Sequence, residues 1–452
     1  MQHDFRSFFY LPYSNTHSRL RVSDLTQKIA SFRKFFARVD ICFAKIYNAR
    51  ITFAHARAIK AVNMPFSVYL KKGEEKRILQ GHSWVYANEV ARIEGKDKNG
   101  SLASVFTHDG RFVGKGYINH LSKILVRVFI RDTETADDES FYSARIKQAV
   151  DMRKDLGFDN SYRAVFAEAD GLPALIVDKY SDYLVCQFLS LGIDKQKDLI
   201  VKCLVDIFAP KGIYERSDSP VRQKEGLQEV TGTLFGEVPE RIVITENGVK
   251  MAVDVRGGQK TGYFLDQKEN RLAARRYAKD RTVLDCFCNS GGFSMNCAPV
   301  AKSVTAIDIS QTALDNVLEN VNLNGYRNVT TVYADVFDEL RKYKADGAKF
   351  GLVILDPPAF CKSASEVKDA YRGYKDINVL GMKLVESGGY LISSSCSHYM
   401  TFPLFEKMLV EAAKESGRIV RCVEVKSQSP DHPSLLCAEE TQYLKFFVMQ
   451  VL

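Results

Sequence analysis

Long apolar runs, paired cysteines and a secretion signal are all missing from this 452-residue chain. No apolar stretch approaches the roughly 18–20 residues that a bilayer-spanning helix needs, so we expect no membrane protein. The N-terminus lacks a short apolar block followed by small residues, so nothing in it favours secretion. The ten cysteines form no C-x-x-C pair, and no histidine near Cys286 and Cys288 completes a zinc set. These absences predict a cytoplasmic protein with buried thiols and no metal site.

An excess of one sign of charge is also missing from most of the chain. Residues 1–63 hold eleven Lys and Arg against three Asp, which accounts for the whole net charge of +8 and leaves 52 basic and 52 acidic residues beyond them. A nucleic-acid surface there must therefore come from where charges lie. Residues 1–63 suit an RNA-contacting arm or a targeting segment. We interpret them as a basic extension, disordered or mis-started, because a compact pattern begins at Met64.

The remaining length suits about three folded domains, since an ordinary domain takes roughly 150 residues. Residues 64–136 show short strands separated by tight turns and predict a β-rich domain. Residues 137–255 mix strands and helices, end in a hairpin turned at Asn247-Gly248, and predict a central α/β scaffold domain.

Residues 256–452 alternate continuous apolar strands with helices after Asp280, which is typical of a parallel sheet covered on both faces. This pattern predicts a Rossmann-like, doubly wound α/β domain. Ligands of such sheets bind outside the carboxyl ends of the strands. Polar residues stand at these predicted ends: Asp285, Asp308, Asp335, Asp356 and Cys396.

The loop that starts at Asp285 and contains Gly291-Gly292 predicts a nucleoside site. Paired glycines let the backbone approach a ligand, and the following helix start offers free N–H groups. The loop is not G-x-G-x-x-G, and Asp308 follows Asp285 by 23 residues, near the roughly 20 expected for a carboxylate that holds a ribose. A ribose site without a pyrophosphate loop favours S-adenosylmethionine. An ordinary tight turn is the alternative for the glycines alone.

The run Asp356-Pro-Pro-Ala-Phe360 is the sharper signal. Two prolines fix φ and remove two N–H donors, which gives a rigid rim. Beside an aromatic residue such a rim can hold a planar base. An ionised Asp accepts from a cytosine amino group, and a protonated Asp donates to a ring nitrogen. The alternative is a turn that merely ends the strand.

Cys396 lies in the hydroxyl-rich run Ser393–His398 at the end of the next predicted strand. Methylation of pyrimidine C5 needs an activated ring, and addition of a thiolate to C6 supplies that activation. Because a free thiol has a pKa of about 8.5, we expect the site to favour the thiolate. Most lone cysteines fill a core, which is the alternative here.

Four runs together resemble the bacterial large-subunit ribosomal RNA 5-methylcytosine methyltransferase I family: Gly258–Arg271, Leu284–Phe293, Leu355–Phe360 and Ser394–His398. The resemblance begins near Pro65. It implies a PUA domain over 64–136, a central α/β domain and a C-terminal class I methyltransferase domain. It also implies S-adenosylmethionine as cofactor and large-subunit ribosomal RNA as partner. The oligomeric state stays open, with a homodimer as one option.

Carried over position by position, the resemblance implies a role for each matched residue. Cofactor binding falls to Phe264, Gln267, Asp285, Phe287, Asn289, Ser290, Gly291, Asp308, Asp335, Val336 and Asp356. The substrate base falls to Pro357, Pro358 and Phe360, and catalysis to Asp356 and the nucleophile Cys396. The run Cys288-Asn-Ser290 departs from the family, which more often has an aromatic residue and a Thr there.

The leading hypothesis is an RNA cytosine-C5 methyltransferase that captures an unstacked cytosine beside Pro357 and Pro358. Two alternatives stay open. One is methylation of a guanine or adenine nitrogen without a covalent intermediate. The other is a non-catalytic RNA-binding assembly factor that keeps only the fold.

Overall fold

The computed structural model describes residues 66–96, 98–361 and 363–452, so the predicted basic extension 1–63 lies outside the described residues. Residues Pro65–Leu452 form one compact unit. Along its described part, every helix is too short or too polar to cross a membrane.

The first domain is rich in β-strands, as predicted, and its described residues form a six-stranded sheet. Its strands are β1 (Phe66–Leu70), β2 (Trp84–Tyr86), β3 (Val90–Gly95), β4 (Leu102–Phe106), β5 (Phe112–Ile118) and β6 (Ile124–Ile130), in the order β2-β6-β5-β4-β1-β3, with one short helix, α2 (Glu75–Leu79). Alternate residues of β1 (Phe66, Val68 and Leu70) are buried, because successive side chains of a strand point to opposite faces.

The central domain is a five-stranded sheet with helices. The sheet order is β11-β10-β9-β8-β7, from β7 (Ser161–Phe166), β8 (Leu175–Tyr180), β9 (Tyr183–Phe188), β10 (Gly212–Ser217) and β11 (Val230–Gly236). The helices are α3 (Glu139–Asp155), α4 (Leu191–Lys195) and α5 (Lys197–Phe208). Asp138 begins α3 by accepting hydrogen bonds from the backbone N–H groups of Ser140 and Phe141, which otherwise lack partners.

The predicted hairpin is confirmed: β12 (Arg241–Glu246) pairs with β13 (Val249–Asp254) across Asn247 and Gly248, both with positive φ. The hairpin is held by the next domain, since the Asn320 side chain accepts a hydrogen bond from Ala252 N at 2.8 Å. The domain boundary drawn at residue 255 stays a prediction.

The C-terminal domain confirms the doubly wound α/β fold. Its sheet order is β16-β15-β14-β17-β18-β20-β19; the first five strands run parallel, and β20 is antiparallel to both neighbours. The strands are β14 (Thr282–Cys286), β15 (Ser303–Asp308), β16 (Val329–Tyr333), β17 (Phe350–Leu355), β18 (Val385–Ser395), β19 (Val420–Lys426) and β20 (Lys445–Val451). The helices are α6 (Lys268–Ala278), α7 (Gly292–Cys297), α8 (Gln311–Asn324), α9 (Val336–Ala345), α10 (Val367–Leu384) and α11 (Phe402–Ser416).

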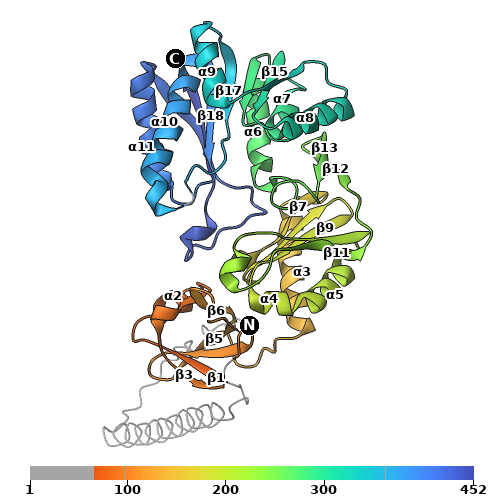
Figure 1. Ribbon diagram of the computed structural model, residues 1–452, viewed down its shortest axis with the longest axis vertical. Helices are drawn as coiled ribbons and strands as arrows, with labels where there is room; N and C mark the ends of the chain where they lie inside the picture. The colour runs from red at the N-terminus through yellow and green to blue at the C-terminus, as the bar shows by residue number, and fades with distance from the viewer. Residues whose placement is uncertain (1–65, 97, 362) are drawn as a thin grey trace, which may run out of the picture. The chain divides into compact units, whose positions relative to one another are not determined.

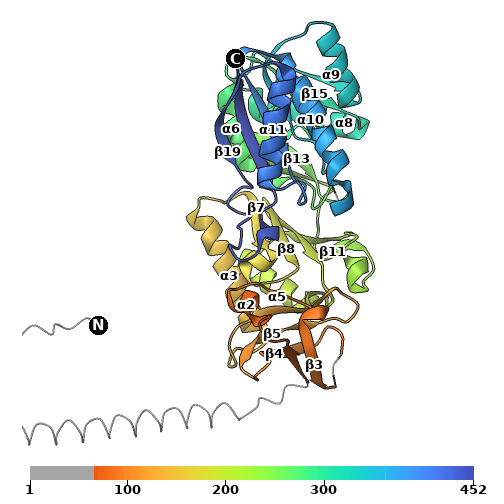
Figure 2. The ribbon, with the colours of Figure 1, turned by 90° about the vertical axis from the view of Figure 1, so that its left-hand side faces the viewer.

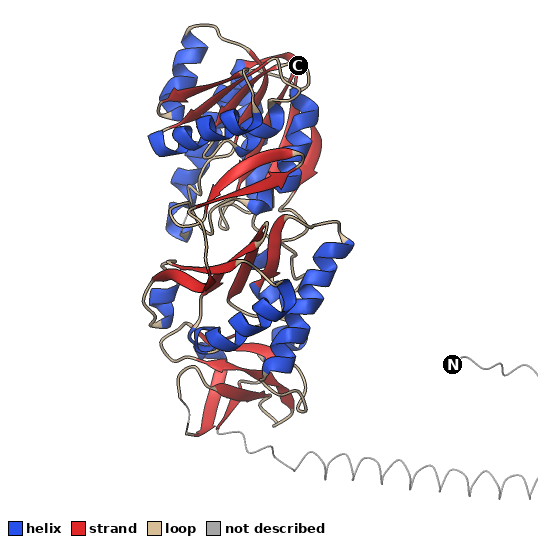
Figure 3. Ribbon diagram, turned by 90° about the vertical axis from the view of Figure 1, so that its right-hand side faces the viewer, coloured by secondary structure: helices blue, strands red, loops and turns tan. Residues whose placement is uncertain are grey.

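Helices cover both faces of this sheet, as Figures 1 and 3 show. Val353 and Leu355 of β17 pack in the core under α10 and α11, which lie side by side in Figure 2. Leu352 and Ile354 pack in the core under α6 and α7 on the other face. Burial of each such side chain contributes about 1.5–3 kcal/mol. A strand buried on both faces therefore reads as the continuous apolar run seen in the sequence.

The helix that follows β15, α8, begins and ends at residues suited to its two ends. The Ser310 hydroxyl accepts a hydrogen bond from Ala313 N and begins α8, and Gly325 ends it at a φ of 67°. Both ends follow from local chemistry, because serine satisfies a free N–H and glycine adopts the left-handed conformation without strain.

Candidate active site

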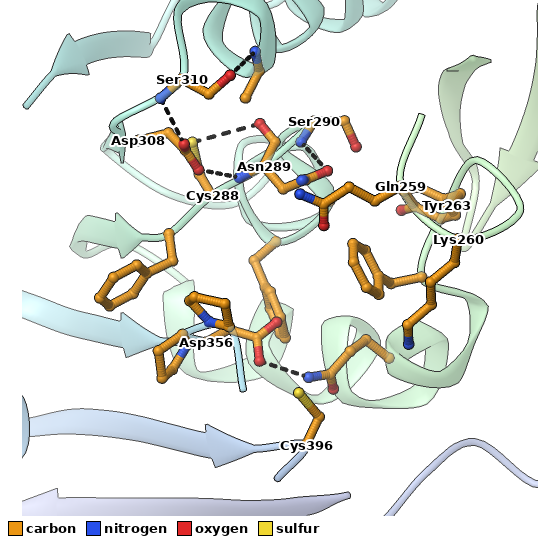
Figure 4. Close-up of a pocket in the computed structure, with 18 of the residues that line it drawn as sticks. Gln259, Lys260, Tyr263, Cys288, Asn289, Ser290, Asp308, Ser310, Asp356 and Cys396 are labelled. Carbon is orange, nitrogen blue, oxygen red and sulfur yellow. Dashed lines mark hydrogen bonds between the residues drawn. The ribbon is translucent and has the colours of Figure 1, made fainter. Parts of the chain in front are cut away.

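A cavity of about 330 Å³ opens at the carboxyl ends of β14, β15, β17 and β18 (Figure 4). Its position follows from the topology, since parallel strands end at one edge of the sheet. Twelve of the predicted site residues line it: Phe264, Gln267, Phe287, Asn289, Ser290, Asp308, Asp335, Val336, Asp356, Pro357, Pro358 and Cys396.

Three predicted residues do not line this cavity: Asp285, Gly291 and Phe360. The Asp285 carboxylate lies behind the loop, where the Ser294 hydroxyl donates to Oδ2 at 2.6 Å. The Phe360 ring packs on Tyr374, with ring centroids 4.7 Å apart, and also on Phe337 and Phe287. The structure therefore places these three residues outside the cavity lining, and the carboxylate of Asp285 and the ring of Phe360 pack behind it.

The loop between β14 and α7 has an unusual backbone. Phe287, Asn289 and Gly291 have φ values of 63°, 50° and 81°, a conformation that costs energy for the two residues with side chains. Hydrogen bonds to β15 hold the loop: Cys288 N donates to Ile307 O at 3.0 Å, and Asn289 N donates to the Asp308 carboxylate at 2.9 Å. This strained loop forms one wall of the cavity.

Asp308 and Asp335 stand at the ends of neighbouring strands. Asp308 accepts from Asn289 N and from Ser310 N, each at 2.9 Å. A carboxylate offers about four acceptor positions, so two remain for a ligand. Asp335 uses Oδ1 to cap α9, accepting from Phe337 N at 2.8 Å. Both acids are held by neutral backbone donors.

Asp356 follows β17 and joins the two sides of the cavity. The Gln267 amide donates to its Oδ1 at 2.9 Å, and the Ser394 hydroxyl donates to the same oxygen. Burial raises the pKa of Asp356 to about 6, against the Ser394 hydrogen bond, while nearby Asp266 adds to the rise. Near neutral pH this carboxyl can therefore either accept or donate a proton.

Cys396 directly follows β18 and is only half-buried, so it is not core filler. Figure 4 shows it beside Asp356, across the cavity from Asp308. We expected the site to favour the thiolate, but the structure favours the protonated thiol. Burial raises the pKa of the Cys396 thiol; Lys260 and Lys445 oppose the rise, and the carboxylates of Asp356 and Asp266 add to it. A desolvated thiol beside like charges keeps its proton.

Hydrogen bonds hold the residues on both sides of Cys396. The Ser395 hydroxyl donates to the Tyr374 hydroxyl at 3.0 Å, and the Tyr374 and Ser397 hydroxyls lie 2.9 Å apart. The Lys445 ammonium donates to Ser397 O at 2.7 Å. The thiol thus stands on a fixed turn.

Comparisons with known proteins agree with this geometry. Residues 68–131 match the model of a PUA-like domain, and residues 222–447 match that of an S-adenosylmethionine-dependent methyltransferase. The ribosomal RNA large subunit methyltransferase I of Aeromonas hydrophila subsp. hydrophila is 43% identical over 86% of this chain and its own whole length. The Vibrio cholerae protein of the same name is 42% identical over 85% of this chain and 99% of its own.

This chain belongs to the ribosomal RNA large subunit methyltransferase I family. Its fold also matches solved structures. A putative SAM-dependent methyltransferase from Streptococcus mutans has a TM-score of 0.73 at 21% identity, over 85% of this chain and all of that one. A putative methyltransferase complexed with SAH has a TM-score of 0.74 at 20% identity, with the same coverage. The predicted PUA-like and class I methyltransferase domains are confirmed.

The cofactor of this methyltransferase, S-adenosylmethionine, fits the residues present. Asp308 keeps free acceptor positions for ribose hydroxyls. Phe287, Asn289 and Ser290 of the β14–α7 loop line the cavity beside Asp308, so one wall offers both carboxylate and backbone groups to a nucleoside. The described residues contain no cluster of three or more potential metal ligands.

Several residues that line the cavity had no role predicted from the sequence. Among them are Lys260, Asp266 and Arg271. The Arg271 guanidinium binds both oxygens of Glu246, at 2.6 and 2.7 Å, and is buried. Burial alone would raise the pKa of Asp266, but Lys260 and His432 hold it below its usual range. The charged residues of the run Gly258–Arg271 were a signal, but Glu246 lies on the β12–β13 hairpin, and no local pattern indicates that Glu246 meets Arg271.

Proposed function

We propose that this protein forms 5-methylcytosine in large-subunit ribosomal RNA through a covalent bond between Cys396 and C6 of the base. The observation that carries the proposal is that Cys396 and Asp356 line the same cavity as Asp308 and the β14–α7 loop. Relatives above 40% identity over nearly their whole length are named ribosomal RNA large subunit methyltransferases. The cytoplasm as location, and a homodimer, stay predictions.

The chemistry explains why a thiol is needed at this position. C5 of cytosine is a poor nucleophile, and a bond from Cys396 Sγ to C6 moves electron density onto C5. When bound, S-adenosylmethionine supplies the electrophilic methyl group that C5 takes up. A base then removes the C5 proton, the Sγ–C6 bond breaks, and Cys396 is restored. The thiol must lose its proton for the attack, because the site holds it protonated beforehand.

Asp356 suits recognition of the cytosine edge. With a pKa of about 6, it can accept from the amino group when ionised or donate to the ring nitrogen when protonated. Donation withdraws electrons from the ring and favours addition at C6. Pro357 and Pro358 form the rim where the unstacked base lies. Phe360 supports that rim from behind.

The cofactor sits on the opposite wall in this proposal. Asp308 holds the ribose, and Asp335 with Val336 borders the adenine. Phe287, Asn289 and Ser290 of the strained loop, together with Phe264 and Gln267, enclose the rest. These side chains exclude water from the reacting atoms, which strengthens every polar contact made there.

The test is methyl transfer by Cys396→Ala to ribosomal RNA, with the nucleosides of the product identified by mass spectrometry. We expect 5-methylcytidine from the wild type and a loss of at least about a thousandfold in the variant. Cys288, the other described cysteine that lines the cavity, is buried and directs its thiol to Asn289 O, so it does not replace Cys396. Cofactor affinity, measured by calorimetry, should not change. Undiminished turnover would eliminate the covalent route, and methylated guanine or adenine in the product would replace cytosine as the substrate.

A matched control is Cys361→Ala. Cys361 also follows the Asp-Pro-Pro run, but its thiol is buried and contacts Ser363 O, at 3.2 Å, rather than the cavity. We expect this variant to keep methyl transfer. Its loss, with Cys396→Ala active, would move the nucleophile to Cys361.

A further inference from the structure

Lys445 is a buried lysine at the start of β20, a strand in which most of the other residues are apolar. Lys445 begins β20, is 3% exposed, and is followed by the buried residues Phe446, Phe447 and Val448. It pairs with Ser395 of β18, the residue before Cys396. A buried ammonium is costly, so such a residue usually has a charged partner or a function.

Among the described residues, no carboxylate pairs with Lys445. The Lys445 ammonium donates to two carbonyl oxygens, Ser397 O and Tyr443 O, each at 2.7 Å. Its Nζ lies more than 4.0 Å from every carboxylate oxygen of the described residues. Burial lowers the pKa of Lys445 to about 8, and the Cys396 sulfur is the group that opposes this shift. The Cys396 thiol is therefore the ionisable group on which the positive charge of Lys445 acts.

The other charged and titratable groups around Cys396 come from four elements. Asp356 follows β17, Asp266 lies in the short helix η4 (Leu265–Gln267), and Lys260 precedes it. The hydroxyls of Tyr374, on α10, and Tyr443, before β20, also interact with the sulfur. The two carboxylates disfavour a thiolate, so the reaction needs a cation that opposes them.

Of the two lysines near the sulfur, Lys445 is the one with a fixed and unshielded charge. The Lys260 side chain is 48% exposed, and its ammonium lies 3.5 Å from the Asp266 carboxylate. Water and Asp266 both screen that charge. Lys445 is held on two carbonyls in the interior, where the local dielectric is low and a charge acts more strongly on its neighbours.

We propose that Lys445 is a positioning residue for Cys396, holding the Ser397 carbonyl and stabilising the negative sulfur with its ammonium charge. This inference rests on the proposed function, because it gives Cys396 the role of nucleophile. Near neutral pH, below the pKa of about 8, the Lys445 ammonium keeps its three protons, and the thiol proton leaves to water. Two roles are thus separable: the hydrogen bonds that orient the turn, and the charge that favours the thiolate.

The experiment measures alkylation of Cys396 by iodoacetamide against pH in the full chain, using mass spectrometry of the modified peptides. Lys445→Gln keeps a hydrogen-bond donor and removes the charge, whereas Lys445→Arg keeps the charge. We expect Lys445→Gln to slow alkylation of Cys396 about tenfold near neutral pH, which corresponds to a pKa one unit higher. Lys445→Arg should retain the wild-type rate. The exposed thiol of Cys422 is the internal reference and should react equally in all three proteins.

An unchanged Cys396 profile in Lys445→Gln, with an unchanged melting temperature, would overturn the proposal. Lys260→Gln is the matched control, and a larger effect there than at Lys445 would also overturn it. If Lys445→Gln does not fold, Lys445→Arg decides: its guanidinium stays charged at every pH, so slower alkylation than wild type contradicts the charge role. Alkylation needs neither RNA nor methyl transfer, so its outcome is independent of the Cys396→Ala test.

Discussion

The central and C-terminal sheets both bury carboxylates, but they partner them in opposite ways. Acids of the central domain with nearly buried carboxylates meet a cation: Asp170 meets Arg153 at 2.6 Å, Asp178 meets Arg163 at 2.8 Å, Glu225 meets Arg127 of β6 at 2.9 Å, and Glu215 meets Lys197 at 2.9 Å. These pairs link elements that are distant in the chain. The paired charges neutralise each other and stabilise the fold.

The acids at the strand ends of the C-terminal sheet have neutral partners. Asp285, Asp308 and Asp356 accept hydrogen bonds from hydroxyl, backbone and amide donors, and none of them forms an ion pair within 4.0 Å with a described Lys, Arg or His. Neutral donors orient a carboxylate without neutralising it. In this molecule, therefore, the partner of a buried acid indicates its role. An acid paired with a cation holds the fold together, and an acid with neutral partners remains able to bind a ligand.

The sharpest test of this contrast is Asp356→Asn. The change keeps the shape and the Gln267 contact but removes the proton that the carboxyl exchanges. We expect methyl transfer to fall by about 10²–10⁴, the usual contribution of a positioned acid or base. The melting temperature should stay near that of the wild type. Full activity in a steady-state assay would show that Asp356 is only a strand-ending residue.

Asp170→Ala should show the reverse pattern. It leaves the Arg153 guanidinium, which is fully buried, without its carboxylate. We expect the free energy of unfolding to drop by about 3–5 kcal/mol, as for other broken buried pairs. Urea denaturation measures this drop, and calorimetry on the folded protein should give an unchanged cofactor affinity. An Asp170→Ala variant with unchanged stability and weaker cofactor binding would contradict the different roles of the acids in the two sheets.

Asp308→Asn tests the strand-end acids as ligands. Hydrogen bonds to a charged group are worth about 1.5–3 kcal/mol, so we expect cofactor affinity to fall roughly 10- to 100-fold in calorimetry. Asp335→Asn is the control within the same wall. Its carboxylate already caps α9, so its effect on affinity should be smaller, with part of the loss appearing as stability. Equal affinity losses would contradict this difference.

The smallest effect concerns pH and has opposite signs in two acids. The folded pKa of Asp285, about 7, lies above its ordinary value of 3.8, so the stability that it contributes is present at low pH and is lost as pH rises toward 7. Burial alone would raise the pKa of Asp431, but His432 lowers it, so its contribution is lost as pH falls. Between about pH 5 and 8, the wild type should lose a few degrees of melting temperature relative to Asp285→Asn. Asp431→Asn should not reproduce that trend.

Much of the fold could be predicted because its signals are local. The caps of α8 at Ser310 and Gly325, and the hairpin turn at Asn247 and Gly248, are properties of neighbouring residues. The continuous apolar run of β17 predicted a strand buried on both faces, which the two cores confirm. Twelve of the predicted site residues line the cavity, because strand ends of a parallel sheet meet at one edge.

Three features of the site could not be predicted because they depend on contacts between separate elements. Phe360 follows the predicted rim, but Phe337 and Tyr374, from α9 and α10, draw its ring away from the cavity. Arg271 binds Glu246, and the pKa of Cys396 is raised by burial and by Asp356 and Asp266, which lie far from it in the chain. No window of the sequence contains these pairs. They exist only when separate elements are packed together.

The sequence by itself determined the order of strands and helices and which chemical groups stand at the strand ends, since hydrophobic periodicity and turn chemistry act over a few residues. Only the tertiary structure decided which of those groups were neutralised, which stayed open, and that a buried lysine stands beside Cys396. The physical reason is that charge and burial depend on distances between side chains, and such distances are created by packing rather than by position along the chain.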